Sequence, residues 1–221
     1  MYVPATRPGY IEYALVVPVD AVVVDLEDAV PEDEKDSARD IASYLLRTHN
    51  AIENLVFRVN TAASGHMIPD LEALLPAGVR TIRLADPRDR GDVETAVKVV
   101  RQLRTRDVKI ELMIENATAL SSLPQLVDGF PEIHAVTFGG SDYLSDVGTT
   151  STETLWEAKK QLVRTAELCG LPAYDTVFSD YRMKEPVFND AHRAALIGFA
   201  GKSVIHPAQI PVTREAFQAA E

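Results

Sequence analysis

Two acidic residues, Glu115 and Asp142, each accompany a short apolar run and could bind a metal ion. Glu115 ends the run Lys109–Glu115, and Asp142 follows the run Ala135–Gly140. Mg²⁺ prefers oxygen ligands and commonly takes one or two carboxylates, with water and substrate oxygens in its other positions. The alternative is that each carboxylate caps the helix that follows it. Because the two runs read as adjacent strands, we prefer metal binding, and such an open site can polarise a substrate oxygen.

Arg58 lies inside another apolar run and requires a negative partner, since an unpaired buried charge is costly. The partner could be Glu27 or Asp28 of this chain, or a substrate carboxylate held by the guanidinium fork. The sequence leaves both readings open. Asp25, Glu27 and Asp28 fall within four residues, and crowded carboxylates raise one another's pKa, which suits a general acid or base. The alternative is that the segment from Asp28 to Glu34 is the acidic, solvated start of a helix.

Small residues at Gly139-Gly140-Ser141 form a turn before Asp142, and backbone N–H groups there could bind an anion. A Gly-Gly pair could equally serve only to turn the chain. Arg7 fits an ordinary loop arginine. His206 precedes a proline, which favours an extended backbone, and it could be catalytic or a structural histidine bonded to the backbone. No Ser or Cys has a paired base at a recognisable spacing, so a covalent nucleophile is unsupported.

Short apolar runs must position these residues. They are rich in Val, Ile, Leu or Phe and mostly do not alternate with polar residues, which is typical of parallel strands buried on both faces. Polar residues lie at or just after the ends of most runs, where barrel enzymes carry their chemistry. The runs are Tyr2–Pro4, Ala21–Glu27, Leu55–Asn60, Thr81–Asp86, Lys109–Glu115, Ala135–Gly140, Pro172–Thr176 and Lys202–His206.

Between the runs lie segments whose apolar residues recur at helical steps of three and four. Such alternation of strand and helix predicts a parallel sheet built from βαβ units. About eight units favour an α/β fold of the (β/α)₈ TIM-barrel type over an open α/β sheet. No Gly-x-Gly-x-x-Gly turn supports dinucleotide binding, and no linker divides the chain, so we expect one compact domain over residues 1–221. The clearest helical segments are Ala38–Leu46, Val93–Leu103, Thr154–Cys169 and Asp190–Phe199.

Composition narrows the class of protein. The chain has 22 Lys+Arg against 33 Asp+Glu and a net charge of −11, so it repels nucleic acid and anionic membranes. No apolar run approaches the ~20 residues that span a bilayer, and no signal-peptide pattern is visible. The single cysteine, Cys169, excludes an intrachain disulfide and a cysteine metal cluster. We therefore expect a cytoplasmic protein that acts on a small molecule.

Five segments carry residue patterns that are specific in combination. They are Tyr2-Val3-Pro4-Ala5-Thr6-Arg7-Pro8, Val24-Asp25-Leu26-Glu27-Asp28-Ala29-Val30, Arg58-Val59-Asn60, Phe138-Gly139-Gly140-Ser141-Asp142-Tyr143 and Gly201-Lys202-Ser203-Val204-Ile205-His206-Pro207-Ala208-Gln209-Ile210. Their order and spacing resemble, along essentially the whole chain, the citrate lyase beta-subunit branch of the HpcH/HpaI aldolase superfamily. This branch includes citryl-, malyl- and citramalyl-CoA lyases.

The resemblance implies an Mg²⁺-dependent lyase that cleaves or forms a carbon–carbon bond beta to a thioester. The products would be a 2-oxo acid and an acyl thioester carried on coenzyme A or an acyl carrier protein. By resemblance, Glu115 and Asp142 would be the metal ligands, and Glu27 and Asp28 would belong to the acid–base machinery. The family also tends to assemble, so we expect a homo-oligomer.

The resemblance further implies that Arg58 and the amides of Gly140 and Ser141 hold the carboxylate of the 2-oxo acid. Arg7 would lie near the thioester or its phosphates. One departure is the family's Pro-Lys-Val-Glu at the end of strand four, which reads Leu84-Ala85-Asp86-Pro87 here.

A second departure is the C-terminus. The chain stops at Glu221, whereas relatives continue, so we expect a barrel with a shortened C-terminal segment. Two alternatives follow from the departures. One is a catalytically weak barrel that serves as a binding or scaffold subunit, and the other is a related aldolase or thioesterase on a different carboxylate substrate.

Overall fold

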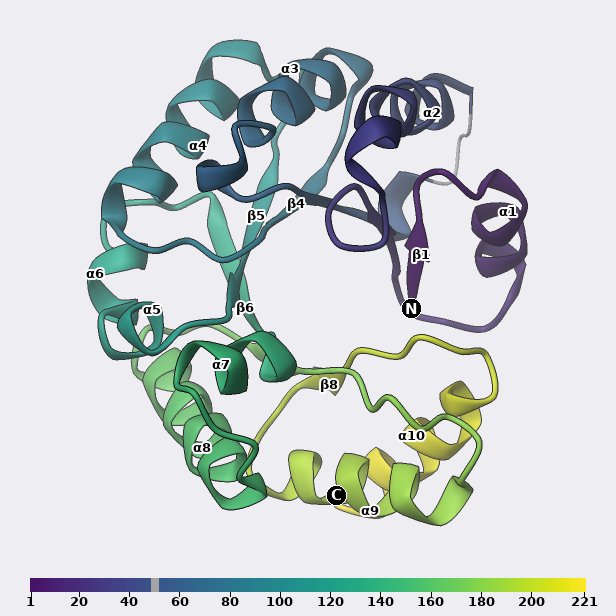
Figure 1. Cartoon of the computed structure of the whole chain (residues 1–221), viewed down its shortest axis with the longest axis vertical. Coiled ribbons are helices and arrows are strands. Elements are labelled where there is room, and N and C mark those ends of the chain that lie inside the picture. Colours follow the sequence, from purple (N-terminus) through teal and green to yellow (C-terminus); the bar gives the residue numbers. More distant parts are fainter. Residues whose placement is uncertain (49–51) are drawn as a thin grey trace.

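The computed structural model describes residues 1–48 and 52–221, and there it contains one sheet of eight parallel strands in the order β1 to β8. Helices alternate with the strands and lie around the outside of the sheet (Figure 1). This α/β, TIM-barrel-like arrangement confirms the predicted fold class. The strands are β1 (Tyr2–Pro4), β2 (Val22–Asp25), β3 (Leu55–Val59), β4 (Thr81–Leu84), β5 (Lys109–Ile114), β6 (Ile133–Phe138), β7 (Ala173–Asp175) and β8 (Gly201–Lys202).

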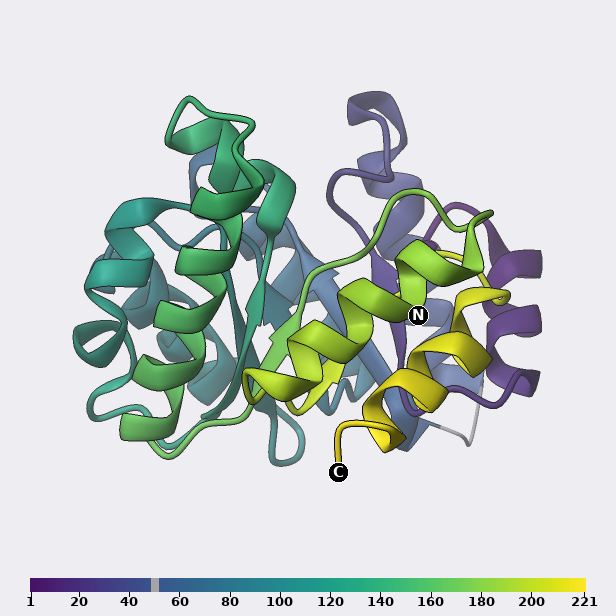
Figure 2. The ribbon, with the colours of Figure 1, turned by 90° about the horizontal axis from the view of Figure 1, so that it is seen from below.

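The sheet curls so that its two edges meet. The Tyr2 N–H donates to the carbonyl of Val204 at 2.9 Å, which brings the segment after β8 against β1. On that side of the molecule α9 packs against α10 (Figures 1 and 2). The curling is why residues at opposite ends of the chain can share one site.

Most helices occupy segments with helical spacing. The four predicted helical segments are confirmed, with wider bounds or bounds shifted by a few residues. The α-helices are α1 (Pro8–Val16), α2 (Lys35–Thr48), α3 (Met67–Ala77), α4 (Arg90–Leu103), α5 (Ala117–Ser121), α6 (Leu123–Val127), α7 (Gly140–Asp146), α8 (Thr152–Leu168), α9 (Lys184–Leu196) and α10 (Gln209–Gln218), and short 3-10 turns are η1 (Glu32–Glu34), η2 (Ile52–Asn54) and η3 (Ala62–Ser64).

Most of the strands are buried on both faces, as their apolar and mostly non-alternating residues predict. Every residue of β2, β3 and β4 is buried, including Asp25, Arg58 and Arg83. Charged residues inside such strands need partners within the barrel, because water is excluded there. Ion pairs between neighbouring strands are therefore expected inside the barrel.

Strand eight is shorter than expected. It ends at Lys202, so the prediction that His206 closes this strand is wrong, and His206 lies in the turn before α10. The Nδ1 atom of His206 accepts the Ala208 N–H at 3.1 Å, and its ring stacks on Tyr181 with centroids 4.2 Å apart. Of the two readings of this histidine, the backbone-bonded one describes its contacts.

The segments that follow β2, β5 and β6 carry Glu27, Asp28, Glu115 and Asp142 to the end of the barrel at which Arg58 of β3 also lies. Among the described residues, no helix is both long and apolar enough to cross a membrane.

Candidate active site

Two adjacent cavities open at the carboxyl end of the strands. The larger, of about 320 Å³, is lined by residues that include Tyr2, Arg58, Ser141 and Thr176. The smaller is of about 260 Å³. Both contain Asp28 and Asp142, so the two cavities are parts of one mouth. The smaller one is lined by Glu27, Asp28, Thr61, Asp86, Arg88, Glu115, Asp142, Ser145 and Asp146.

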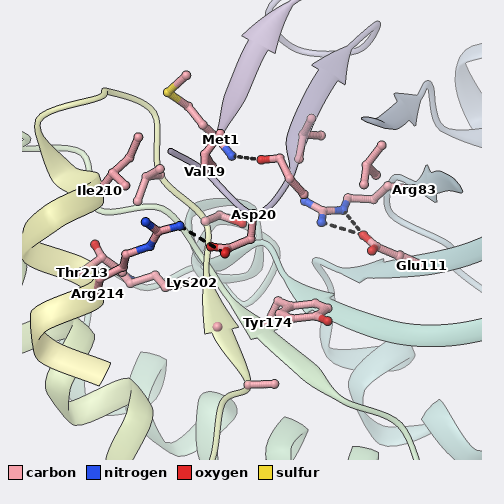
Figure 3. Close-up of a pocket in the computed structure, with 17 residues that line it drawn as sticks. Met1, Val19, Asp20, Arg83, Glu111, Tyr174, Lys202, Ile210, Thr213 and Arg214 are labelled. Carbon is pink, nitrogen blue, oxygen red and sulfur yellow. Dashed lines mark hydrogen bonds and ion pairs between the residues drawn. The ribbon is translucent and has the colours of Figure 1, made fainter. Parts of the chain in front are cut away.

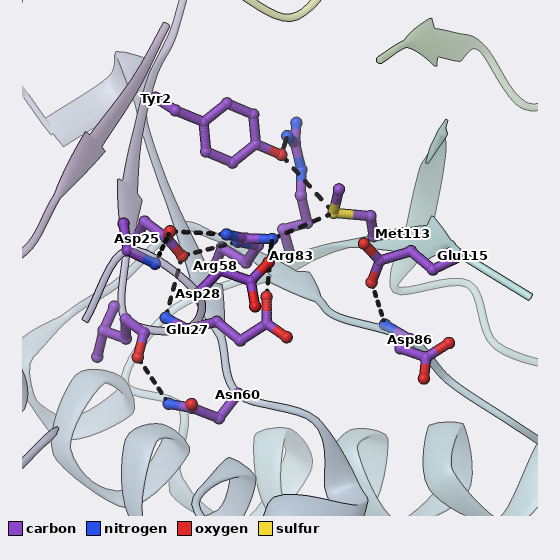
Figure 4. A network of polar contacts seen from close by, with 12 residues as sticks. Tyr2, Asp25, Glu27, Asp28, Arg58, Asn60, Arg83, Asp86, Met113 and Glu115 are labelled. Carbon is purple, nitrogen blue, oxygen red and sulfur yellow. Dashed lines mark hydrogen bonds and ion pairs between the residues drawn. The ribbon is translucent and has the colours of Figure 1, made fainter. Parts of the chain in front are cut away.

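Arg58 forms the central ion pair of the site (Figure 4). Its Nε and Nη2 atoms lie 2.7 and 2.6 Å from the two carboxylate oxygens of Asp25. Its Nη1 atom lies 2.7 Å from Glu27 Oε2 and 3.3 Å from Asp28 Oδ2. The prediction of an ion pair with Glu27 or Asp28 is confirmed, and Asp25 is an additional partner that fills the fork. Any carboxylate that approaches Arg58 from the cavity must do so at Nη1.

Asp25 also fixes the acidic loop that follows β2. Its carboxylate accepts the N–H groups of Glu27 at 3.0 Å and Ala29 at 3.1 Å. These bonds turn the chain so that Glu27 points back at Arg58. Burial raises the pKa of Glu27 from its usual 4.5 to about 7, although the Arg58 charge opposes the rise. Of the predicted acidic helix start between Asp28 and Glu34, only the second half is helical, because the turn η1 begins at Glu32 and leads into α2, so Glu27 lies outside it.

A second buried arginine, Arg83, lies deeper in the barrel and was not singled out from the sequence. Arg83 and Glu111 are register partners on β4 and β5, with Arg83 Nη2 2.6 Å from Glu111 Oε2. Arg83 also donates to the Tyr2 hydroxyl, and the Tyr2 ring lies 5.3 and 5.4 Å from the guanidinium carbons of Arg58 and Arg83. The signal was present in the sequence, since one arginine and one glutamate interrupt two apolar runs.

The Arg83–Glu111 pair also borders a third cavity, of about 410 Å³, near the amino ends of β1, β2 and β8 (Figure 3). Here Arg214 Nη2 lies 3.2 Å from Asp20, and Lys202 Nζ lies 2.6 Å from Asp175, which does not itself line the cavity. The charged side chains of this cavity are thus already paired. The Arg83–Glu111 layer separates it from the mouth at the opposite end.

Glu115 directly follows β5, one residue beyond the end of the strand, and is almost completely buried (Figure 4). Its Oε2 atom accepts the Asp86 N–H at 2.9 Å. The opposite side packs against Gly139, where a Cβ atom would lie only 2.4 Å from Glu115 Oε1. Burial first, and then the negative charge of nearby carboxylates such as Glu27, raise the pKa of Glu115 from its usual 4.5 to about 9, although the Arg58 charge opposes the rise. The alternative that Glu115 caps a helix is wrong, because Asn116 caps α5 by accepting the Ala119 N–H.

Asp142 lies in the first turn of α7 with its side chain exposed to the mouth. Its negative charge raises the pKa of both Glu115 and Glu27. Within residues 1–48 and 52–221 its carboxylate has no hydrogen-bond or ion-pair partner, and the N-cap of α7 is Gly139 without a side-chain cap. The capping alternative therefore does not describe Asp142 either.

Glu115 and Asp142 fit a hard divalent cation. The described residues contain no group of three or more His, Cys, Asp or Glu side chains placed to hold a metal. Two carboxylates with open positions are nevertheless the usual protein contribution to an Mg²⁺ site. The negative charges of neighbouring carboxylates raise the pKa of the buried Glu115. A divalent cation bound between these carboxylates would offset their mutual repulsion.

The predicted anion-binding amides are only partly available. The Gly140 N–H donates to Thr176 Oγ1 at 3.1 Å, which sequence reasoning missed. The Ser141 N–H has no partner among the described residues and borders the larger cavity. Arg7 is the N-cap residue of α1, exposed and without an ion pair in the described part of the chain, and it lines neither mouth cavity. The structure thus brings together all of the predicted site residues except Arg7.

A separate buried cluster holds strands β7 and β8 to their helices. Lys202 Nζ lies 2.6 Å from both Asp175 and Asp190, and Lys159 Nζ lies 3.0 Å from Asp175. Burial lowers the pKa of Lys159, and the Lys202 charge lowers it further. These four residues form closed ion pairs away from the mouth, so we assign them a structural role.

The chain matches the family model described as HpcH/HpaI aldolase/citrate lyase over residues 1–207. It is 32% identical over 236 aligned residues to the mitochondrial citramalyl-CoA lyase of Rattus norvegicus, covering 98% of this chain and 70% of that protein.

Solved structures with the same architecture include the citrate lyase beta subunit from M. tuberculosis complexed with oxaloacetate and magnesium. That structure is 26% identical, with a TM-score of 0.84, covering 99% of this chain and 95% of its own. A structure of CitE from Mycobacterium tuberculosis with magnesium, acetoacetate and coenzyme A is 26% identical with a TM-score of 0.83, covering 98% of this chain and 79% of its own.

Proposed function

Because the chain belongs to the HpcH/HpaI aldolase/citrate lyase family, we propose that it is a magnesium-dependent carbon–carbon lyase. Its substrate would be a β-hydroxyacyl thioester of the citryl-, malyl- or citramalyl-CoA type. Cleavage would give a 2-oxo acid and an acyl thioester, and the reverse reaction would join them. The observation that carries the proposal is that Glu115, directly after β5, and Asp142, in α7, line one cavity together with Glu27.

Glu115 and Asp142 would hold the Mg²⁺ ion, leaving positions open for substrate oxygens. When bound, the ion would supply Lewis-acid stabilisation of negative charge on a substrate oxygen. Gly139 permits this use of Glu115, because any larger residue would occupy the space of its carboxylate. The relative complexed with oxaloacetate and magnesium supports the choice of ion and of ligand class.

The carboxylate of the 2-oxo acid would bind the free Ser141 N–H and approach Arg58 at Nη1. The weakest contact of that nitrogen is with Asp28, at 3.3 Å, and the Asp28 side chain is 64% exposed. A substrate carboxylate can therefore take the place of Asp28 without breaking the buried Asp25 pair. Asp28 is then free to serve as a solvent-linked proton relay in the mouth.

Glu27 would move the proton between the substrate hydroxyl and the enzyme. A general acid or base works best when its pKa is close to the working pH, and burial brings the Glu27 pKa to about 7. The contact with Arg58 Nη1, at 2.7 Å, keeps the carboxylate pointed into the mouth. Arg58 thus positions Glu27 and contacts the substrate.

The thioester carrier would be coenzyme A or an acyl carrier protein. Arg7 follows β1 at the same end of the barrel and has no ion pair among the described residues, so it can donate hydrogen bonds to a phosphate of the carrier. The relative solved with coenzyme A supports the first carrier.

A second candidate function is a catalytically weak barrel that acts as a binding or scaffold subunit. The observation in its favour is Asp86, an acid beside Glu115, in the segment Leu84-Ala85-Asp86-Pro87 that lacks the lysine of the family's Pro-Lys-Val-Glu. An acid there adds to the negative charge of the mouth. A related aldolase or thioesterase activity on a different carboxylate would use the same residues.

Isothermal titration separates these functions. Mg²⁺ is titrated first, followed by pyruvate or oxaloacetate in the presence of Mg²⁺, for the wild-type protein and the variants Glu115→Ala and Asp142→Ala. Binding that both variants abolish, and that the exposed control Asp107→Ala leaves intact, is the expected result. Mg²⁺ binding that survives in both variants would refute the assigned ligands, and no 2-oxo acid binding by the wild type would favour the scaffold.

A further inference from the structure

Arg88 lies on the wall of the smaller cavity, in the loop between β4 and α4. It lines this space together with Glu115 and Asp142, and its side chain is 56% exposed. Apart from Arg88, the charged residues on this wall are all acids. Any negatively charged part of a ligand that enters here meets repulsion everywhere except at this guanidinium.

Two carboxylates hold Arg88 in place and leave one nitrogen free. Its Nε atom lies 2.8 Å from Asp86 Oδ2, and its Nη1 atom lies 2.9 Å from Asp146 Oδ1. The Nη2 atom has no partner within residues 1–48 and 52–221. Arg58 differs, because all three of its nitrogens already contact acids. Of the two arginines of the mouth, Arg88 alone offers a pre-oriented and uncommitted donor.

The residue that holds Arg88 also holds the candidate metal ligand. Asp86 donates its N–H to Glu115 Oε2 at 2.9 Å, and its Oδ1 atom accepts from Asn116 Nδ2 at 2.7 Å. Asp86 has a φ of +40°, and it is the one non-glycine residue with positive φ in the described chain. Such strain persists where the surroundings over-determine the conformation, and it is frequent at functional sites. Asp86 thereby fixes the guanidinium of Arg88 relative to Glu115.

We propose that Arg88 is a specificity-determining residue that binds a second carboxylate of the substrate. This inference rests on the proposed function, in which the first carboxylate of the 2-oxo acid binds the Ser141 N–H and Arg58. The preferred class is then a 2-oxo acid with two carboxylates, or the thioester made from it. A monocarboxylic 2-oxo acid leaves Arg88 Nη2 without a ligand partner.

The binding preference follows from the charge of the wall. A second carboxylate gains a charge-assisted hydrogen bond from Arg88 and is otherwise repelled by neighbouring acids such as Asp146. Replacement of Arg88 by glutamine removes the favourable contact and keeps the repulsion. The loss must therefore fall on dicarboxylic ligands and spare monocarboxylic ones.

The test compares freshly dissolved oxaloacetate with pyruvate, each titrated into the wild-type protein with saturating Mg²⁺. We expect the wild type to bind oxaloacetate about tenfold more tightly than pyruvate, as one charge-assisted hydrogen bond would give. Arg88→Gln should abolish this preference while Mg²⁺ and pyruvate affinities stay within about twofold of wild type. Arg88→Lys should retain part of the preference because it retains the charge. Arg104→Gln, at the far end of α4, is the matched control and should leave the preference unchanged.

Other outcomes separate this inference from the proposed function. Normal Mg²⁺ and pyruvate binding by the wild type without a preference for oxaloacetate would overturn the role of Arg88 alone. If Arg88→Gln weakens the binding of oxaloacetate and pyruvate equally, or weakens the binding of Mg²⁺, then Arg88 only supports the structure of the site. That result would also overturn its proposed role as a carboxylate-binding residue. Absence of Mg²⁺ binding by the wild type would overturn the proposed function and this inference with it.

Discussion

Arg58 and Asp25 are cross-strand partners on β3 and β2, and two of the arginine nitrogens lie 2.7 and 2.6 Å from the two carboxylate oxygens. The pair is buried, so each charge depends on the other for its solvation. Glu27 and Asp28 are then secondary partners that reach the remaining nitrogen. The Arg58–Asp25 pair is therefore structural, whereas a substrate carboxylate can replace a partner only at the third nitrogen of Arg58.

The buried pair predicts a large effect on stability. Asp25→Asn leaves the Arg58 charge without its two-point partner and also weakens the loop bonds to Glu27 and Ala29. We expect the free energy of unfolding, measured by urea titration, to fall by about 3 kcal/mol. Glu53→Gln, which removes an exposed pair with Arg80 at 3.4 Å, should cost under about 1 kcal/mol. Equal effects of the two substitutions would contradict this account.

The buried glutamates predict that stability falls as pH rises. The pKa values of Glu115 and Glu27 are about 9 and about 7 in the folded protein, against a usual 4.5. The folded protein therefore binds more protons than the unfolded chain between about pH 4.5 and 9, so their contribution is fully present below pH 4.5 and is lost as pH rises through 7 and 9. Urea titrations at a series of pH values, without divalent ions, measure this slope.

Glutamine at position 115 should flatten the slope. Glu115→Gln keeps the shape of the side chain and cannot ionise, so we expect it to be more stable than wild type at pH 9 by at least ~1 kcal/mol. The exposed Glu153→Gln on α8 is the control and should reproduce the wild-type slope. A wild-type slope in Glu115→Gln would show that other groups titrate instead.

Gly139 predicts a steric test of the metal site. An alanine Cβ would lie 2.4 Å from Glu115 Cγ and Oε1, so Gly139→Ala must displace the carboxylate or the turn. We expect Mg²⁺ affinity, measured by calorimetry, to fall at least about tenfold, and stability to fall by about 1–3 kcal/mol. Gly9→Ala, with open space at its Cβ position inside α1, should leave Mg²⁺ affinity unchanged and stability equal or higher. Unaltered Mg²⁺ binding in Gly139→Ala would argue against Glu115 as a ligand.

A bound ion should also stabilise the fold. Mg²⁺ at one hundred times its dissociation constant is expected to raise the free energy of unfolding by about 2.7 kcal/mol. Asp142→Ala should abolish this gain without lowering the stability of the metal-free protein, because the Asp142 side chain has no partner in the described residues. Thermal unfolding in EDTA and in Mg²⁺ measures both quantities. A gain that persists in Asp142→Ala would place the ion elsewhere.

Much of the fold was readable from local pattern. Apolar runs such as Leu55–Asn60 predicted buried parallel strands, and helical spacing over Val93–Leu103 predicted one of the covering helices. The prediction for strand eight, Lys202–His206, was too long. The residues after Lys202 include the apolar Val204 and Ile205, but they do not pair as a strand. The main candidate residues Glu115, Asp142, Glu27 and Arg58 came from the polar ends and interruptions of these runs.

The sequence by itself determined the kinds of element and the polar residues that each strand carries, because residue periodicity is a local property of the chain. Only the tertiary structure decided which side chains meet. Strand register set Asp25 against Arg58 and Arg83 against Glu111, and the pairing of β4 with β5 brought Asp86, which holds Arg88, to Glu115. Residues about thirty positions apart come into contact because their strands pair. Which residues face each other depends on the strand register, and the register leaves no periodic pattern in the sequence.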